Sequence, residues 1–267
     1  MRRLLTKRPG ARRADEDLYG GRRRFLKGAL LAGAAAALCG AASPRLCAKE
    51  TAAKPAQGDI VILALGDSLT AGYGLPAAAA FPAALERRLR ADGVAARVVN
   101  AGVSGDTTSG GLARLDWAMG DGVDAAIVEL GANDMLRGVD PKIARAALRG
   151  ILEKLRARGV PVLIAGMRAS GNLDAAYRAE FDAIYPDLAR EFDAALYPFF
   201  LDAAFGRPAL LLPDGLHPNA AGVEAIVAAI LPQAKALAAK ARAASSPENS
   251  AAPGAGDAAK GALDTKG

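Results

Sequence analysis

The sequence predicts an α/β protein in which helices flank a parallel β-sheet, and three observations support this prediction. Residues 60–65 form an apolar run without period-2 alternation, which is typical of a strand covered on both faces. Segments with helical spacing lie between most of the strand-like runs, and such alternation produces parallel βαβ units. The other four runs are residues 97–100, 125–130, 160–167 and 196–202.

Four helices are expected from apolar periodicity, at residues 77–91, 141–158, 174–192 and 220–240. Asp140 is a suitable N-cap for the second of these helices, and Gly159 is a suitable stop. Pro232 lies inside the fourth segment, so we expect an interruption or a kink there.

Residues 59–240 carry these patterns and are numerous enough for one well-buried domain. Residues 49–58 have the composition of a linker. Residues 241–267 are rich in alanine, serine, proline and glycine and lack periodic apolar positions, so a disordered tail is expected.

The positive charge of the chain is concentrated at its start. Residues 1–27 contain ten Lys or Arg and three Asp or Glu, a net charge of +7, whereas the whole chain carries +6. The remaining residues therefore carry a net charge of −1. A folded part without excess positive charge excludes nucleic acid as the expected partner.

Residues 1–48 are predicted to be an export signal. Arg22-Arg23-Arg24-Phe25-Leu26-Lys27 precedes an apolar run, residues 28–42, in the manner of a twin-arginine signal, although Gly21 stands where that pattern has Ser or Thr. We expect transient contact with the twin-arginine export machinery and a periplasmic or secreted product. An exposed basic tail and an uncleaved anchor are the alternatives.

The two cysteines, Cys39 and Cys47, both lie in this signal region. No internal disulfide is therefore expected in the mature protein. The folded part has one histidine and no cysteine, so no metal and no cofactor are expected.

Polar residues follow the predicted strands where their carboxyl ends meet, which is where open α/β sheets bind ligands. Ser68 comes directly after the first strand, and His217, the single histidine, follows Asp214 by three positions. Serine, a base and an orienting acid are the parts of a nucleophilic hydrolase. The main-chain N–H of Ser68, the backbone at Gly105 and the amide of Asn133 are expected to donate to an oxyanion.

These motifs resemble the SGNH or GDSL-type lipolytic hydrolases, and within them the bacterial thioesterase I, lysophospholipase and arylesterase group. The resemblance extends over nearly all of residues 59–240. It implies a flavodoxin-like three-layer α/β/α sandwich with Ser68 as nucleophile, His217 as base and Asp214 as its orienting acid. It also implies an oxyanion hole from Ser68, Gly105 and Asn133. The motifs are Gly66-Asp-Ser-Leu69, Ser104-Gly-Asp-Thr107, Gly131-Ala-Asn-Asp134 and Asp214-Gly-Leu-His217.

The substrate site is expected beside Met135, Leu136, Ser170 and Gly171, which are apolar or flexible. Ser170 and Gly171 stand where relatives commonly carry proline, so acyl-length preference is open. We expect a monomer that hydrolyses acyl esters: aryl esters, thioesters and lysophospholipids. The alternatives are a carbohydrate O-acetylesterase of the same fold and a non-catalytic lipid- or sugar-binding module.

The export signal gives a testable prediction. With Arg22 and Arg23 both changed to lysine, the protein should stay in the cytoplasm at full length, because twin-arginine transport depends on that pair. Cell fractionation with an antibody against the folded domain measures this. Unchanged delivery of the variant to the periplasm would exclude this route.

Overall fold

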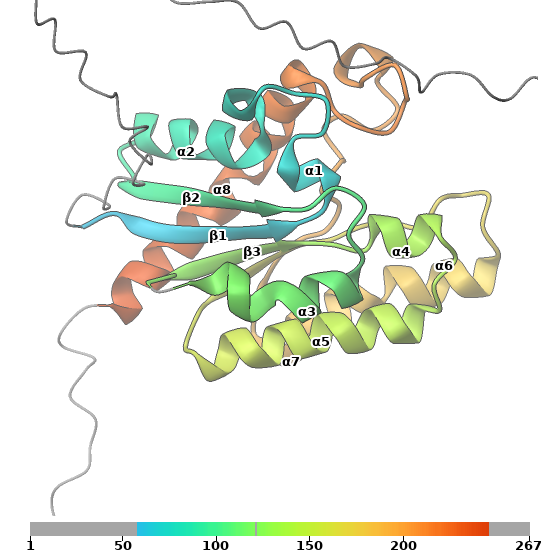
Figure 1. Cartoon of the computed structure of the whole chain (residues 1–267), viewed down its shortest axis with the longest axis horizontal. Helices are drawn as coiled ribbons and strands as arrows, with labels where there is room; N and C mark the ends of the chain where they lie inside the picture. Colours follow the sequence, from blue (N-terminus) through green and yellow to red (C-terminus); the bar gives the residue numbers. More distant parts are fainter. Residues whose placement is uncertain (1–57, 121, 246–267) are drawn as a thin grey trace, which may run out of the picture. The chain divides into compact units, whose positions relative to one another are not determined.

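Five parallel strands form one sheet with helices on both of its faces (Figure 1). The computed structural model describes residues 58–120 and 122–245. The strand order is β2-β1-β3-β4-β5, and each neighbouring pair is parallel. The predicted five-stranded parallel sheet and three-layer arrangement are confirmed. The strands are β1 (Ile60–Gly66), β2 (Ala96–Gly102), β3 (Ala125–Glu129), β4 (Val162–Ala165) and β5 (Ala195–Tyr197).

Strand β1 determines where a site can form. All seven of its residues are buried, and Gly66 pairs in register with Gly102 of β2 and with Glu129 of β3. The chain passes from β1 outward to β2 and then returns to the other side of β1 for β3. Connections that leave in opposite directions open a crevice at the carboxyl ends of the two strands, here between β1 and β3.

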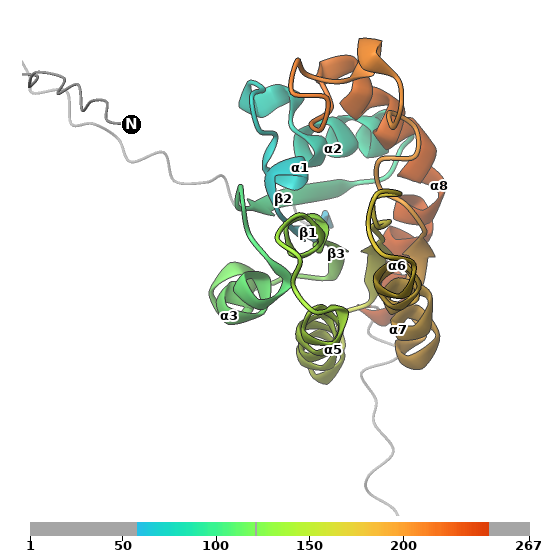
Figure 2. The ribbon, with the colours of Figure 1, turned by 90° about the vertical axis from the view of Figure 1, so that its right-hand side faces the viewer.

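Two helical layers cover the sheet, as Figures 1 and 2 show. Helices α2 (Phe81–Ala91) and α8 (Ala220–Ala244) pack together on one face. Helices α3 (Thr108–Met119), α5 (Pro141–Ala157) and α7 (Ile184–Phe192) cover the other face. The short helices α1 (Ser68–Ala71) and α4 (Ala132–Leu136) lie at the carboxyl edge of the sheet, directly after β1 and β3.

Prolines shorten or divide three of the predicted elements. The helix predicted at residues 77–91 is a 3-10 turn, η1 (Ala77–Ala79), followed by α2 with Pro82 in its first turn. The helix predicted at residues 174–192 is divided at Ala183 into α6 (Ala175–Asp182) and α7, because Pro186 follows. A proline has no N–H to donate, and its ring collides with the carbonyl four residues earlier, so neither helix continues through it.

The fifth strand is shorter than predicted for a related reason. It was expected at residues 196–202, but β5 ends at Tyr197, directly before Pro198. Proline cannot donate to the ladder of a sheet, so the pairing with β4 stops there. The chain then continues through turns and the 3-10 turn η2 (Pro208–Leu210) to α8. This segment carries Asp214 and His217.

Helix α8 corrects the predicted domain boundary at residue 240. It runs without interruption through Pro232 to Ala244, and Ala241 is fully buried in the core. Within residues 58–120 and 122–245, α8 alone is long and apolar enough to span a membrane, and 44% of that window is buried. Packing against the sheet accounts for its apolar face. The predicted export signal, the linker up to residue 57 and the tail from residue 246 lie outside the described residues.

Helix α3 was not predicted, because Gly110 and Gly111 make its sequence a poor helix former. Thr107 caps this helix by accepting from the N–H of Gly110 at 3.2 Å. A Cβ at Gly111 would lie 2.4 Å from Cδ1 of Leu130, so a larger residue there would displace this buried leucine side chain. Packing therefore outweighs intrinsic propensity. In α5, the predicted N-cap is confirmed: Asp140 accepts from the N–H of Lys142 at 2.8 Å.

The close approach of β2 to α1 gives a stability prediction. A Cβ at Gly102 would lie 2.2 Å from the main-chain nitrogen of Ala71, and that backbone cannot rotate away. Gly102→Ala should therefore reduce the free energy of unfolding by at least about 2 kcal/mol, as overpacked sites do. Urea unfolding at constant pH measures this loss. Gly171→Ala is the control, because nothing lies within 4 Å of its added Cβ; equal midpoints for the two variants would contradict the prediction.

Candidate active site

Ser68 stands at the first position of α1, at the carboxyl end of the central strand β1. Asp67 is the N-cap of this short helix and accepts from the N–H of Leu69 at 2.9 Å. Asp67, Leu69 and Thr70 are buried, whereas Ser68 is half-buried and lines a cavity. The turn is thus fixed on both sides of the one side chain that faces outward. Figure 2 looks onto this edge of the sheet.

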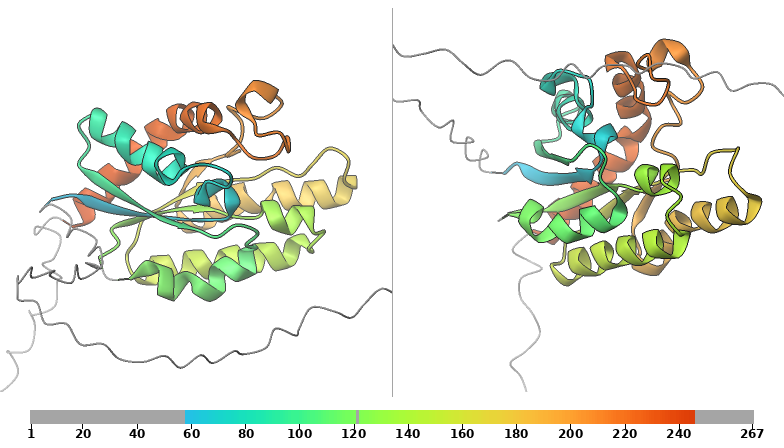
Figure 3. Two further views of the ribbon diagram at one scale, coloured as in Figure 1. Left: turned by 45° about the horizontal axis from the view of Figure 1, so that its top comes forward. Right: turned by 45° about the vertical axis from the view of Figure 1, so that its right-hand side comes forward.

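His217 and Asp214 lie in one tight turn between β5 and α8. Oδ1 of Asp214 accepts from the N–H groups of Leu216 at 2.9 Å and of His217 at 3.0 Å. Gly215 between them has φ +69°, a left-handed conformation that glycine adopts without strain. The N–H of Leu212 donates to the carbonyl of His217 at 2.7 Å and closes the turn. Figure 3 shows this segment, in orange, at the same edge of the sheet as α1.

The imidazole of His217 contacts both other members of the predicted triad. Its Nδ1 lies 2.7 Å from Oδ2 of Asp214, and its Nε2 lies 2.9 Å from Oγ of Ser68. The ring of Tyr73 packs over it with a centroid distance of 4.5 Å. The structure therefore brings together three residues of which Ser68 and His217 are 149 positions apart.

The charge of Asp214 determines which atoms donate and which accept in this chain of hydrogen bonds. The backbone N–H of His217, then that of Leu216, and then the His217 side chain lower the pKa of Asp214 to about 2. Asp214 is therefore ionised at neutral pH and can only accept a hydrogen bond. A neutral His217 then carries its proton on Nδ1, which leaves Nε2 free to accept from the hydroxyl of Ser68. This is the tautomer that a general base needs.

The three predicted oxyanion donors follow three different strands, β1, β2 and β3, at this edge. The amide Nδ2 of Asn133, in α4, donates to Oδ2 of Asp67 at 3.1 Å, and Asn133 lines the cavity. Gly105 follows β2 with φ +82°, and its carbonyl accepts from Nη2 of Arg137 at 2.6 Å. Within the described residues, the N–H groups of Ser68 and Gly105 donate to no protein acceptor. Gly105 itself is not among the residues that line the cavity.

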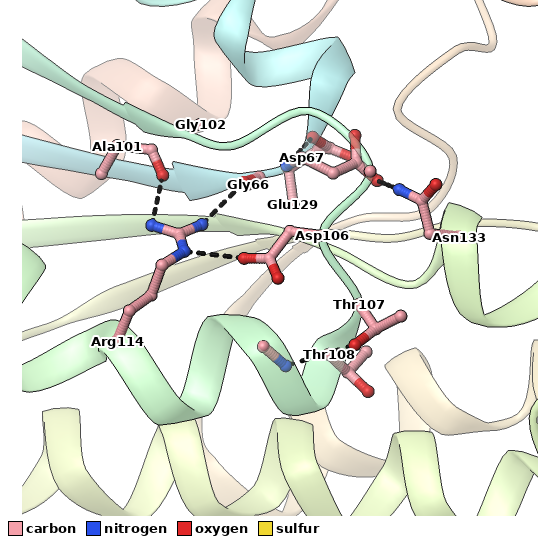
Figure 4. Close-up of polar contacts among 12 residues, drawn as sticks. Gly66, Asp67, Ala101, Gly102, Asp106, Thr107, Thr108, Arg114, Glu129 and Asn133 are labelled. Atoms are coloured by element: carbon pink, nitrogen blue, oxygen red, sulfur yellow. Dashed lines mark hydrogen bonds and ion pairs between the residues drawn. The ribbon is translucent and has the colours of Figure 1, made fainter.

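Arg114 of α3 connects the ends of β1 and β2 (Figure 4). Its guanidinium donates to Asp106 at 2.7 Å, to the carbonyl of Ala101 at 2.8 Å and to that of Gly66 at 2.9 Å. This arginine thereby holds the loop of Gly105 beside the turn of Ser68. Asp106 thus accepts from a side chain, whereas Asp134 accepts from the N–H of Thr108 at 2.8 Å and from its hydroxyl at 2.7 Å.

A cavity of about 500 Å³ opens in front of Ser68. The four residues predicted to bind substrate, Met135, Leu136, Ser170 and Gly171, all line it. Of the run 210–212, Leu211 lines the cavity, while Leu210 and Leu211 also pack against the core. The lining residues that were not predicted include six with long or aromatic side chains: Met167, Arg168, Phe199, Leu201, Phe205 and Leu216.

These six residues share a position that the sequence indicates only indirectly. Five of them come after β4 or in the turns after β5, and Leu216 lies between Asp214 and His217. Phe199 packs edge-on against Phe205 with a centroid distance of 5.4 Å, and the Arg168 guanidinium lies 5.3 Å from the Phe199 ring centroid. The sequence signal that could have identified these residues is their proximity to the carboxyl end of a strand. In residues 58–120 and 122–245, no group of three or more His, Cys, Asp or Glu could hold a metal ion.

Comparison with known proteins identifies the family. Residues 64–225 match the GDSL-like Lipase/Acylhydrolase family. The chain belongs to this family. It is 42% identical over 159 residues to thioesterase 1/protease 1/lysophospholipase L1 of Escherichia coli (strain K12), covering 59% of this chain and 75% of that protein. It is 37% identical over 177 residues to esterase TesA of Pseudomonas aeruginosa, covering 66% and 88%.

A solved structure of the same family shows a similar fold. AlinE4, an SGNH-hydrolase family esterase, is 54% identical and superposes with a TM-score of 0.57 over 67% of this chain and 97% of that one. This GDSL-family domain thus spans nearly the whole of that esterase. The predicted membership of the SGNH or GDSL group is confirmed.

The triad geometry gives the next prediction. Ser68→Ala and His217→Ala should each lower kcat for an activated ester by at least about 10³-fold, because nucleophile and base act as a unit. Steady-state kinetics measure this loss, and a fluorophosphonate probe should label Ser68 alone. Ser109→Ala, an exposed serine in α3, is the control and should retain full activity. Turnover by Ser68→Ala at the wild-type rate would contradict the assignment.

Proposed function

We propose that this GDSL-family chain is a serine esterase and thioesterase that hydrolyses acyl esters through an acyl-enzyme. One observation carries the proposal: Asp214, His217 and Ser68 form an unbroken hydrogen-bond relay of 2.7 Å and 2.9 Å that ends in an open cavity. The printed names of its relatives, a thioesterase and lysophospholipase and two esterases, support the same class of reaction.

The first half of the reaction forms the acyl-enzyme. Oγ of Ser68 attacks the carbonyl carbon of the ester while Nε2 of His217 takes the hydroxyl proton. Ionised Asp214 stabilises the resulting imidazolium through Nδ1. The tetrahedral intermediate then collapses, its bond to the alcohol or thiol breaks, and His217 returns the proton to that leaving group.

The second half releases the acid. A water molecule attacks the acyl-enzyme carbonyl and gives its proton to His217. The ester bond to Ser68 breaks, and the proton returns to Oγ. In both halves the negative charge on the carbonyl oxygen is stabilised by N–H donors, for which Ser68, Gly105 and Asn133 are the candidates.

The cavity favours a substrate with an apolar acyl chain. Nine of its lining side chains are large and apolar, and its volume falls in the range of sites for drug-sized ligands. Fixed polar groups of the kind that orient a sugar ring are few on its walls. We therefore favour medium-chain acyl esters, aryl esters, thioesters and lysophospholipids. The large apolar residues are Leu69, Met135, Leu136, Met167, Phe199, Leu201, Phe205, Leu211 and Leu216.

We also propose that the enzyme acts in the periplasm or as a secreted protein. The support is the sequence of residues 22–27 and the apolar run after it, which precede the folded domain. The transient partner implied by this proposal is the twin-arginine export machinery.

Acyl-chain length provides a test of the substrate. For p-nitrophenyl esters of two to sixteen carbons, kcat/KM should rise about fourfold per methylene, the equivalent of about 0.8 kcal/mol, until the cavity is full. Phe205→Ala should remove part of this rise for longer chains and leave the acetate rate unchanged, because Phe205 lines the cavity.

The matched control is Trp117→Ala. Trp117 is 85% exposed on α3 and is not part of the cavity wall, so this variant should keep the wild-type length profile. A sharp optimum at acetate, together with deacetylation of acetylated xylan, would replace the lipolytic proposal with a carbohydrate esterase. A lack of any Ser68-dependent rate would favour a binding module.

A further inference from the structure

Two carboxyl groups lie buried next to each other beneath the turn of Ser68, and the steps of acyl transfer use neither. Asp67 is 0% exposed and Glu129 is 1% exposed. Glu129 ends β3 and is the register partner of Gly66, so its side chain lies against the residue that precedes Ser68 (Figure 4). The N–H of Asp67 donates to Oε2 of Glu129 at 3.4 Å.

The hydrogen bonds around the two carboxyl groups differ. Both oxygens of Asp67 accept from N–H donors: Oδ1 from Leu69 at 2.9 Å and Oδ2 from the amide of Asn133 at 3.1 Å. Glu129 accepts only through Oε2, chiefly from the hydroxyl of Thr70 at 2.8 Å. Its Oε1 is buried and has no partner in the described part of the chain. Asp67 thus has a hydrogen-bond donor at each oxygen, as an ionised carboxylate needs, whereas one oxygen of Glu129 has none.

Charge repulsion gives the same assignment. Two ionised carboxylates buried together repel each other, and each also loses its hydration. Burial, and then the charge of Asp67, raise the pKa of Glu129 well above its ordinary value. Burial raises the pKa of Asp67 to about 6, opposed by its hydrogen bonds to Leu69 and Asn133 and by His217. At neutral pH the proton therefore stays on Glu129, and Asp67 is ionised.

We propose that Asp67 and Glu129 form a carboxyl pair with a single proton, and that Asp67 is a positioning residue for the oxyanion donor Asn133. The inference rests on the proposed hydrolase function. An amide nitrogen has two N–H groups. Asp67 engages one of them, which fixes the amide plane and leaves the second available toward the cavity that Asn133 lines. Neutral Glu129 stabilises Asp67 in this orientation without adding a second buried charge.

A double-mutant cycle tests the link between Asp67 and Asn133. Asp67 accepts through both of its oxygens, whereas an asparagine there has one acceptor oxygen and one NH2 group. For Asp67→Asn, kcat should therefore fall about tenfold or more while KM changes less than about twofold. Asn133→Ala should lower kcat by about 10² to 10³-fold. Because Asp67 acts through Asn133, the double variant should be no slower than Asn133→Ala alone. Losses that multiply would overturn the proposal.

The controls separate this inference from the proposed function. Ser68-dependent turnover by the wild type is measured first, and its absence refutes the hydrolase, whereas additive losses refute only the positioning role. Asp124→Asn is the matched variant: Asp124 accepts from the N–H of Val61 at 2.8 Å at the far end of β1, so its kcat should not change. If Asp67→Asn does not fold, Asp67→Ser keeps a capping hydroxyl that is too short to reach Asn133, and the same cycle applies.

Glu129→Gln tests the single proton, because glutamine is the neutral isostere of a protonated glutamate. An acid whose folded-state pKa is raised binds its proton more tightly when folded, so stability falls as pH rises above its unfolded value. The wild type should therefore lose stability as pH rises above the ordinary pKa of a glutamate, about 4.3, and Glu129→Gln should lose less. The other titratable groups near the pair, His217, Tyr185, Asp134 and Asp182, are present in both proteins, so the difference reports chiefly the removal of the Glu129 carboxyl group.

Thermal unfolding across this pH range provides the measurement. The expected result is a folded Glu129→Gln protein with kcat near that of the wild type and a flatter profile of stability against pH. Identical profiles would show that Glu129 is ionised in the folded protein and would overturn the proposal. Failure of Glu129→Gln to fold would overturn it as well, because a neutral acid should tolerate a neutral replacement.

Discussion

The burial of β1 on every side is the constraint on which the rest of this domain depends. The strand has a neighbour on each edge and helices on each face, and all seven of its residues are buried. The backbone can turn toward solvent only at its carboxyl end. A Cβ at Gly66 would lie 2.0 Å from Oγ1 of Thr70, so the turn there is closed as tightly as glycine allows. Ser68 lies at this point because the chain leaves the core only at the carboxyl end of β1.

The same edge collects the buried polar residues. In the described ranges, the fully buried polar side chains are Asp67, Thr70, Thr108, Glu129 and Asp134. All of them lie at the ends of β1 and β3 or at the starts of α1, α3 and α4, the helices that follow the three central strands. Each carboxyl group among them accepts from at least one backbone or hydroxyl donor, which offsets part of the cost of burying it. A polar layer thus separates the apolar core from the cavity.

Sequence patterns were sufficient for the sheet and for the reacting groups. The apolar run of β1 and the spacing of Asp214 and His217 are local signals, and the structure places these residues as that spacing implies. The breaks at Pro82, Pro186 and Pro198 were also visible locally, but apolar periodicity was given more weight than proline. Helix α3 could not be predicted in this way, because its glycines lie against Asp106 and Leu130, contacts that local propensity does not reveal. Glu129 gave no signal, since a carboxyl group at the end of a strand is usually exposed.

The tight turn that holds both Asp214 and His217 affects what motion can do to this site. His217 and Asp214 are three residues apart and are joined by one backbone and one side-chain hydrogen bond, while the N–H of Leu216 holds the same carboxylate, so they form one rigid unit. A movement of the segment between β5 and α8 carries both together. Such a movement changes the distance from Nε2 to Ser68 and leaves the imidazole tautomer as it was. A displacement of this turn would therefore break the contact between Nε2 and Ser68 without changing the tautomer that Asp214 favours.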